Sequence, residues 1–233
     1  MILSAVFAAL VAVPAAGERW TDEDVAAAQA ELDALCRAMQ PFMERPDKFK
    51  GLKIERDEAI NAFADMKGNV TFFTGMLDFL NSEDEAAAVC GHEMAHLAAQ
   101  HIKRSMGRRI GGVILDIIVD RNVGDLAGDL VGGAFVNKQS RSHEREADRR
   151  GLNYMWNAGF DPRVSWKLWE AMAEASEGEP LLAKYLSTHP VHSERIENFK
   201  VLTYKWCLEN PARKYCNEIR GDAELRAAYE NFE

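Results

Sequence analysis

The sequence predicts a mainly α-helical domain that carries a small β-sheet. Long segments place apolar residues at helical spacing, and two short runs rich in aromatic and β-branched residues flank a glycine-containing turn near residue 68. The chain has 233 residues, 47% of them hydrophobic, which is enough for one domain with a buried core. Its formal net charge of −9 argues against nucleic acid or anionic lipid as the main partner.

The first sixteen residues differ in kind from the rest of the chain. The segment from Ile2 to Val13 is apolar, and Pro14-Ala15-Ala16-Gly17 supplies the small residues of a cleavage site. We expect residues 1–16 to be a secretory signal peptide, since the apolar run is too short to span a membrane. Residues 17–233 would then form a single exported domain, periplasmic or secreted, without a transmembrane segment.

Export permits disulfides, and the four cysteines differ in their surroundings. Cys207 and Cys216 flank a turn signal at Asn210-Pro211 and are a candidate pair. Cys36 falls on an apolar helical stripe, and Cys90 faces away from the histidine two residues later. We expect both of these to be buried thiols, although the sequence does not decide whether they pair.

The first elements follow in order. Thr21, with Asp24 three residues later, caps a helix that we expect to end near Pro41. Residues 52–57 form a weaker strand candidate, and residues 61–64 and 70–74 read as two strands around a Lys67-Gly68-Asn69 turn. Ser82 and Glu85 then make a capping box for a helix expected to run from about Glu83 to near Lys103.

The second half of the chain is predicted to be helical. Residues 110–136 are apolar but interrupted by glycine and aspartate, so they form either a pair of short helices or a lid over a cleft. Helices are expected at about residues 139–158 and from Asp161-Pro162 to near residue 177. Residues 200–233 should form a C-terminal helical extension.

The helix after Ser82 contains the most informative motif, His92-Glu93-Met94-Ala95-His96. Two histidines four residues apart share one helix face and can bind one metal ion. Glu93 is rotated by about 100° from His92, so it is better placed to contact a water at the metal than to ligate. This is the arrangement of a zinc hydrolase, with Glu93 as the general base.

A third ligand is needed, because a catalytic zinc takes three protein ligands and keeps one position for water. His101 is five residues past His96 and should point elsewhere. Glu144 and Asp148 share one face of a later helix, where two carboxylates repel unless a cation lies beside them. We therefore expect Glu144 to ligate and Asp148 to accept the outer N–H of a ligating histidine. The neighbouring alternatives, Glu146 and His143, are less well oriented.

Several motifs together resemble one gluzincin family, that of the CAAX prenyl endopeptidase, HtpX and BepA. They lie between Asn61 and Phe199: Asn61-Ala62-Phe63-Ala64, Thr74-Gly75-Met76-Leu77, Gly91 to His96, Ser140 to Asp148, and Ser187-Thr188-His189-Pro190. The resemblance implies a zincin-like fold, with His92, His96 and Glu144 as the ligands of one Zn²⁺ per chain. It also implies an envelope role in removing misassembled proteins. The spanning helices of its membrane members have no counterpart here.

The predicted activity is zinc-dependent hydrolysis of peptide bonds in unfolded or misassembled envelope proteins. A further protein of the envelope is a candidate partner. The strand at Ala62, Phe63 and Ala64 would be a sheet edge that pairs with extended substrate. The resemblance places His189 near the zinc, as an oxyanion stabiliser or as an inhibitory fourth ligand. Two alternatives stay open: a periplasmic chaperone or adaptor with weak or conditional proteolysis, and a structural zinc closed by His189.

Overall fold

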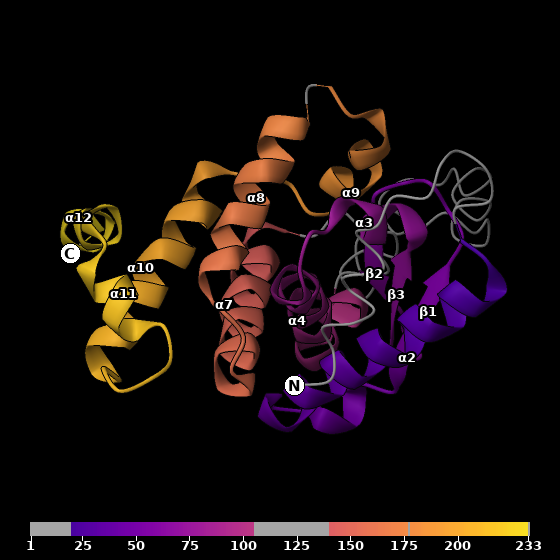
Figure 1. Cartoon of the computed structure of the whole chain (residues 1–233), viewed down its shortest axis with the longest axis horizontal. Helices are drawn as coiled ribbons and strands as arrows, with labels where there is room; N and C mark the ends of the chain where they lie inside the picture. Colours follow the sequence, from indigo (N-terminus) through magenta and orange to yellow (C-terminus); the bar gives the residue numbers. More distant parts are fainter. Residues whose placement is uncertain (1–19, 105–139, 177, 233) are drawn as a thin grey trace, which may run out of the picture.

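Figure 1 shows the computed structural model, which describes residues 20–104, 140–176 and 178–232. The expected signal peptide at residues 1–16 and the segment at residues 110–136 lie outside these ranges. Within them the chain is mostly helical and carries one three-stranded sheet, so the predicted α+β class is confirmed. None of the helices in these ranges has the length and apolar character that a membrane span requires.

The sheet consists of β1 (Gly51–Glu55), β2 (Ala62–Ala64) and β3 (Asn69–Phe73), in the order β1-β3-β2. The central strand β3 is parallel to β1 and antiparallel to β2. The β2–β3 turn needs the glycine that the sequence supplies, because Gly68 has φ of 98°. Asp65 fixes the same turn, since its carboxylate accepts the backbone N–H groups of Lys67 and Asn69.

Helix α2 (Asp22–Met39) covers the outer edge of β1, and β2 is the other edge strand of the sheet (Figure 1). It begins at the predicted capping box, in which Thr21 Oγ1 accepts the N–H of Asp24. Asp33 and Gln29 of α2 accept the backbone N–H groups of Leu52 and Ile54 at 2.8 and 3.1 Å. An edge strand is open to pairing until its N–H groups are satisfied. These two bonds therefore close one edge of the sheet.

Helices α4 (Glu83–Ala99) and α7 (Arg141–Ala158) form the central pair, at the middle of Figure 1. They touch through backbone: a Cβ on Gly151 would lie 2.8 Å from the carbonyl carbon of Gly91 and from the nitrogen of His92. Only glycine permits this approach, which brings the histidines of α4 against the acidic face of α7. Serines cap both helices, with Ser82 and Ser140 accepting N–H groups of the first turn.

The expected end of α4 near Lys103 is wrong. The helix ends at Ala99, because Gln100 adopts the left-handed conformation with φ of 55°. Residues 101–104 then follow a new helical turn. This break changes the direction in which the His101 side chain points.

The C-terminal helices extend away from the sheet, with α12 at the far end of the molecule in Figure 1. Short elements make the connections: η1 (Gln40–Phe42), η2 (Pro46–Lys48), α3 (Thr74–Phe79), η3 (Pro180–Leu182) and α9 (Ala183–Thr188). The larger helices are α8 (Arg163–Ala175) and α10 (Ser193–Glu209), followed by α11 (Cys216–Gly221) and α12 (Ala223–Phe232). The predicted C-terminal helical region is thus α10 to α12.

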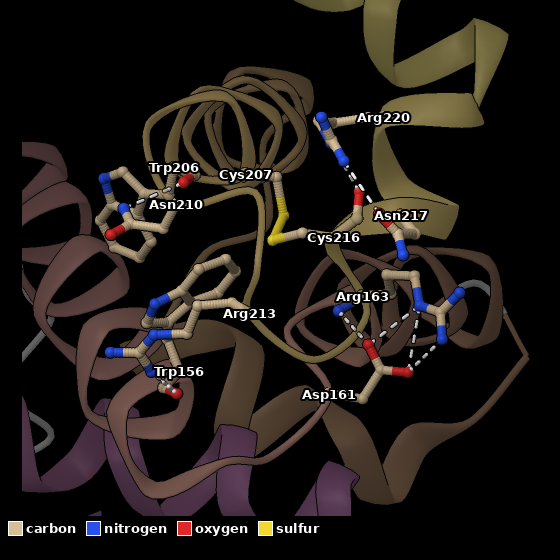
Figure 2. Close-up of a disulfide and its surroundings, with 10 residues drawn as sticks. All are labelled: Trp156, Asp161, Arg163, Trp206, Cys207, Asn210, Arg213, Cys216, Asn217 and Arg220. Carbon is tan, nitrogen blue, oxygen red and sulfur yellow. Dashed lines mark hydrogen bonds and ion pairs between the residues drawn. A yellow bond between two sulfur atoms is a disulfide. The ribbon is translucent and has the colours of Figure 1, made fainter.

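Two disulfides join these elements. Cys207 and Cys216 link α10 to α11, as the turn between them predicts, and Arg213 in that turn donates to the carbonyl of Trp156 (Figure 2). The expectation of buried thiols at Cys36 and Cys90 is wrong, since these two residues are bonded to each other. Each does face the core, but the packing of α2 against α4 brings their Cα atoms to 6.1 Å, a distance that a disulfide spans.

Candidate metal centre

Four side chains from three parts of the chain converge at one buried point. His92 and His96 come from α4, Glu144 comes from α7, and His189 directly follows α9. One donor atom of each lies within 4.8 Å of the others, and all four residues are buried. The spacing of four residues puts the two histidines on one helix face, and the contact between Gly91 and Gly151 brings Glu144 to them.

The donor atoms have the spacing that a small tetrahedral cation needs. The Nε2 atoms of His92 and His96 are 3.0 Å apart, and His189 Nδ1 lies 3.2 Å from both His92 Nε2 and Glu144 Oε2. Carboxylate oxygens of Glu144 lie 3.4 and 3.5 Å from the His92 and His96 Nε2 atoms. Metal–nitrogen bonds of about 2.0–2.1 Å in tetrahedral geometry put donors about 3.3 Å apart. These residues therefore fit a bound metal.

The electrostatics of the described residues also favour a cation at this point. Burial would lower the pKa of His92, but the carboxylates of Asp148 and Glu144 raise it to about 9. Burial would likewise raise the pKa of Glu144, but the histidines beside it hold that pKa well below its usual value. Oε1 of Glu144 has no hydrogen-bond partner in the described part of the chain, although it is buried. Without a metal, the raised pKa means that the His92 ring carries a second proton. A metal ion would balance the charge of Glu144 in place of that proton.

Asp148 lies behind His92. Its Oδ1 is 3.1 Å from His92 Nδ1, so the carboxylate can accept the proton of that nitrogen while Nε2 faces the other donors. Arg195 of α10 binds Asp148 through two bonds of 2.7 Å and lies 3.1 Å from Glu144. Burial alone would raise the pKa of Asp148, but this guanidinium keeps it below the ordinary value. Asp148 thus lies between the His92 ring and the guanidinium of Arg195.

His101 supports His96 in the same way, a role that the sequence did not predict. The left-handed turn at Gln100 returns the chain, so that His101 Nδ1 lies 2.9 Å from His96 Nδ1. His101 Nε2 lies 3.0 Å from Glu146, and the His101 ring stacks on His143 at 4.1 Å. As expected, His101 is not one of the four donors, but its side chain points toward His96 rather than away from the site. Glu146 contacts His101 rather than the donor group, and His143 packs against the His101 ring.

Glu93 lies between the donor group and the free edge of the sheet. Its Oε2 accepts the N–H of Ala64 at 3.1 Å, and its Oε1 lies 3.5 Å from His189 Nε2. Burial raises the pKa of the Glu93 carboxyl, against the opposing effect of His189 and His92. A carboxylate with a raised pKa is suited to take up a proton near neutral pH.

The hydrogen bonds of β2 show which side of the strand is free. Asp65 N–H donates to the Asn69 carbonyl, and Phe73 N–H donates to the Asn61 carbonyl, so the odd-numbered residues bond to β3. Alternate residues of an antiparallel strand turn their N–H and C=O groups to opposite sides. The backbone groups of Ala62 and Ala64 therefore point away from β3, as the bond from Ala64 to Glu93 shows.

Arg195 was not identified from the sequence. It is 2% exposed, and its guanidinium lies 4.0 Å from the ring centre of Trp169. Its spacing of four residues from Phe199, also buried, places both on the inner stripe of α10 and is the signal that could have revealed it. A buried arginine requires carboxylate partners. The sequence shows two on α7, but not that α10 packs there.

Comparison with known proteins identifies the family. The model of peptidase family M48 matches residues 26–203, which include every residue of the donor group. The chain belongs to peptidase family M48. The match covers the sheet as well as α4 and α7, so the family extends over most of the described fold.

The chain is also similar to curated metallopeptidases. The chain is 32% identical to the mitochondrial metalloendopeptidase OMA1 of Arabidopsis thaliana over 143 residues, which are 61% of this chain and 29% of that protein. It is 35% identical to OMA1 of Schizosaccharomyces pombe over 64% of this chain and 45% of the relative. It is 27% identical to metalloprotease LoiP of Escherichia coli over 64% of this chain and 60% of LoiP. The chain thus spans less than two thirds of each of these relatives.

Proposed function

We propose that the protein is a zinc-dependent endopeptidase that hydrolyses extended or unfolded polypeptides. The observation that carries the proposal is the position of Glu93. Its carboxylate lies between a four-donor group that fits a tetrahedral metal and the free edge of β2. A general base, a metal and a surface for an extended chain are the three parts that such a reaction needs.

In this proposal His92, His96 and Glu144 hold one zinc ion per chain. Three nitrogen and carboxylate ligands with a further position for water are the donor set of a catalytic zinc. When bound, zinc lowers the pKa of a water at the site to about 7 and polarises the carbonyl of the substrate. Asp148 and Arg195 keep the His92 ring in place, while His101 and Glu146 do so for His96.

Glu93 would transfer the proton. Its carboxylate would accept a proton from the attacking water as the bond from the water oxygen to the carbonyl carbon forms, and would then give that proton to the amine nitrogen as the C–N bond breaks. The hydrogen bond from Ala64 fixes one Glu93 oxygen and leaves the other free, since Oε1 has no hydrogen-bond partner among the described residues. That free oxygen is the one positioned for the proton.

The substrate would lie along β2 as an added strand. The outward N–H and C=O groups of Ala62 and the outward C=O of Ala64 are the natural partners of an extended chain, since the N–H of Ala64 is already bonded to Glu93. At the opposite edge of the sheet, α2 closes β1. Recognition through backbone groups tolerates varied side chains. This supports action on unfolded proteins rather than on one folded partner.

The Nδ1 atom of His189 lies 3.2 Å from donor atoms of both His92 and Glu144, which supports a role as a fourth ligand. We infer that it acts as a fourth ligand in a resting state, in the place that water needs. Replacement of His189 by alanine should then weaken zinc binding yet raise the rate of peptide hydrolysis at saturating zinc. A lower rate at saturating zinc would instead indicate that His189 stabilises the oxyanion formed during peptide hydrolysis.

We further propose that the protein acts outside the cytoplasm, in the periplasm or secreted, on unfolded or misassembled proteins of the envelope. The two disulfides support an oxidising compartment. The names of the OMA1 relatives place those proteins in mitochondria. A cysteine-labelling assay on cell fractions, with and without reductant, would test the location, since cytoplasmic protein would carry free thiols.

Glu93→Gln is the direct test of the enzyme. Glutamine keeps the size of the side chain and the acceptor for Ala64 N–H but is not a base. Purified wild-type protein with one equivalent of zinc should cleave unfolded casein about 10²–10⁴ times faster than the variant. The zinc content of both proteins, measured by mass spectrometry, should be equal.

Equal cleavage by both proteins would contradict the role of Glu93. If neither protein cleaves casein while both bind it, the chaperone or adaptor interpretation replaces the enzyme. His96→Ala provides the control for the metal, since its zinc content should fall.

A further inference from the structure

A hollow of about 200 Å³ opens directly beside the candidate metal centre, and His96 forms part of its wall. The rest of the wall comes from the β2–β3 turn, from the residues before β1, and from the end of α4 and the helical turn after it. Four cationic side chains line it: Lys48, Lys50, Lys67 and Lys103. We name it the lysine pocket after these four residues.

The two carboxylates in the same wall, Asp47 and Asp65, balance only half of this positive charge. Asp47 pairs with Lys48 at 2.8 Å. Asp65 is engaged by the turn, where it accepts two backbone N–H groups and the side-chain amide of Asn69. Lys50, Lys67 and Lys103 form no ion pair within the described part of the chain. A local excess of cations is notable in a chain whose net charge is −9.

The pocket lies where a substrate strand on β2 would pass. Ala64, the last residue of β2, donates to Glu93, and the next residues, Asp65 to Gly68, belong to the wall of the pocket. A strand advances about 3.3 Å per residue. A side chain about one to three residues from the bond beside Glu93 therefore comes within reach of the lysines.

The opposite end of β2 has the opposite charge. A larger hollow of about 950 Å³ begins at Ile60, just before β2, and its wall contains one arginine, Arg56. Five acidic residues share that wall: Asp22, Asp57, Glu58, Asp78 and Glu179. Of these two hollows, the cationic one lies at the end of β2 where Glu93 contacts Ala64.

We propose that the lysine pocket is a substrate subsite that binds an acidic side chain, Asp or Glu, on one side of the cleaved bond. The inference rests on the proposed endopeptidase function and gives it a substrate preference. The preference arises from charge, so it weakens as salt screens the lysines, whose side chains are mostly exposed.

The test maps cleavage sites in a library of unfolded peptides by mass spectrometry. Wild-type protein with zinc should cut preferentially where Asp or Glu lies within three residues on one side of the bond. A peptide pair that differs only by Glu against Gln at the preferred position then gives a ratio of kcat/KM. We expect a ratio of roughly three to ten, the range for one or two partly exposed ion pairs.

The triple variant Lys50→Gln, Lys67→Gln, Lys103→Gln should bring this ratio close to one. The matched control is Lys53→Gln, Lys167→Gln, Lys205→Gln, which removes the same charge from exposed lysines outside the pocket. The control should keep the wild-type ratio. Raising sodium chloride from 0.05 to 0.5 M should lower the ratio for wild type but not for the pocket variant.

Cleavage without acidic enrichment, or enrichment that survives in the pocket variant, would overturn the subsite while leaving the endopeptidase intact. A loss of the ratio in the control variant as well would assign the preference to overall charge and also overturn the subsite. No cleavage by the wild-type protein would overturn both proposals.

Discussion

Replacement of His101 by alanine gives a sharp prediction about the candidate metal centre. When Nε2 of His96 faces the metal, Nδ1 must carry the ring proton, and His101 Nδ1 is its acceptor at 2.9 Å. Burial outweighs Glu146 and lowers the pKa of His101 to about 4, so its ring is neutral at pH 7. It can accept from His96 and donate to Glu146 at once.

The size of the effect follows from this geometry. His101 is fully buried, so its removal leaves the His96 N–H without an acceptor in the metal-bound protein. An unsatisfied buried donor costs about 1–3 kcal/mol. The metal-free ring can place its proton on the other nitrogen, so most of this cost falls on metal binding. We expect His101→Ala to weaken zinc binding about 10- to 100-fold, as removal of such supporting residues does.

A competition titration with a chromophoric chelator at pH 7.5 measures the zinc dissociation constant. His101→Gln is the matched variant, because an amide can accept from His96 and donate to Glu146. It should stay within about threefold of wild type. An unchanged constant for His101→Ala refutes the argument, and equal losses in both variants show that stacking on His143 matters rather than the hydrogen bonds.

Three further changes test the scaffold by chemical denaturation. Arg195→Met leaves two buried carboxylates without their cation and should lower the free energy of unfolding of the metal-free protein by about 3–5 kcal/mol; a change below 1 kcal/mol would contradict this. Gly151→Ala forces α4 and α7 apart and should cost about 1–3 kcal/mol, whereas Gly221→Ala, where a Cβ meets nothing within 4 Å, should cost less than 1 kcal/mol. Joint replacement of Cys36 and Cys90 by alanine opens a loop closed over 54 residues and should cost about 4 kcal/mol. No loss relative to the wild type under non-reducing conditions would indicate that the bridge does not form.

The local elements were largely predictable because their signals lie close together in the chain. Thr21 with Asp24 and Ser82 with Glu85 set the starts of α2 and α4, and the Gly68 turn set the β2–β3 hairpin. The end of α4 was not predictable in the same way. Nothing in the local sequence marks Gln100 as left-handed, since glutamine rarely adopts this conformation.

The sequence by itself determined the four-residue spacing of His92 and His96, with Glu93 turned away from them, because helix geometry fixes those directions. It also favoured Glu144 and Asp148, since like charges on one face need a cation. Tertiary structure decided the rest. Arg195, His101 and the bond from Ala64 to Glu93 depend on how α10, the turn at Gln100 and β2 pack around α4. Contacts between distant segments leave no periodic signal in the chain, and the same packing converts scattered lysines into a pocket beside the metal centre.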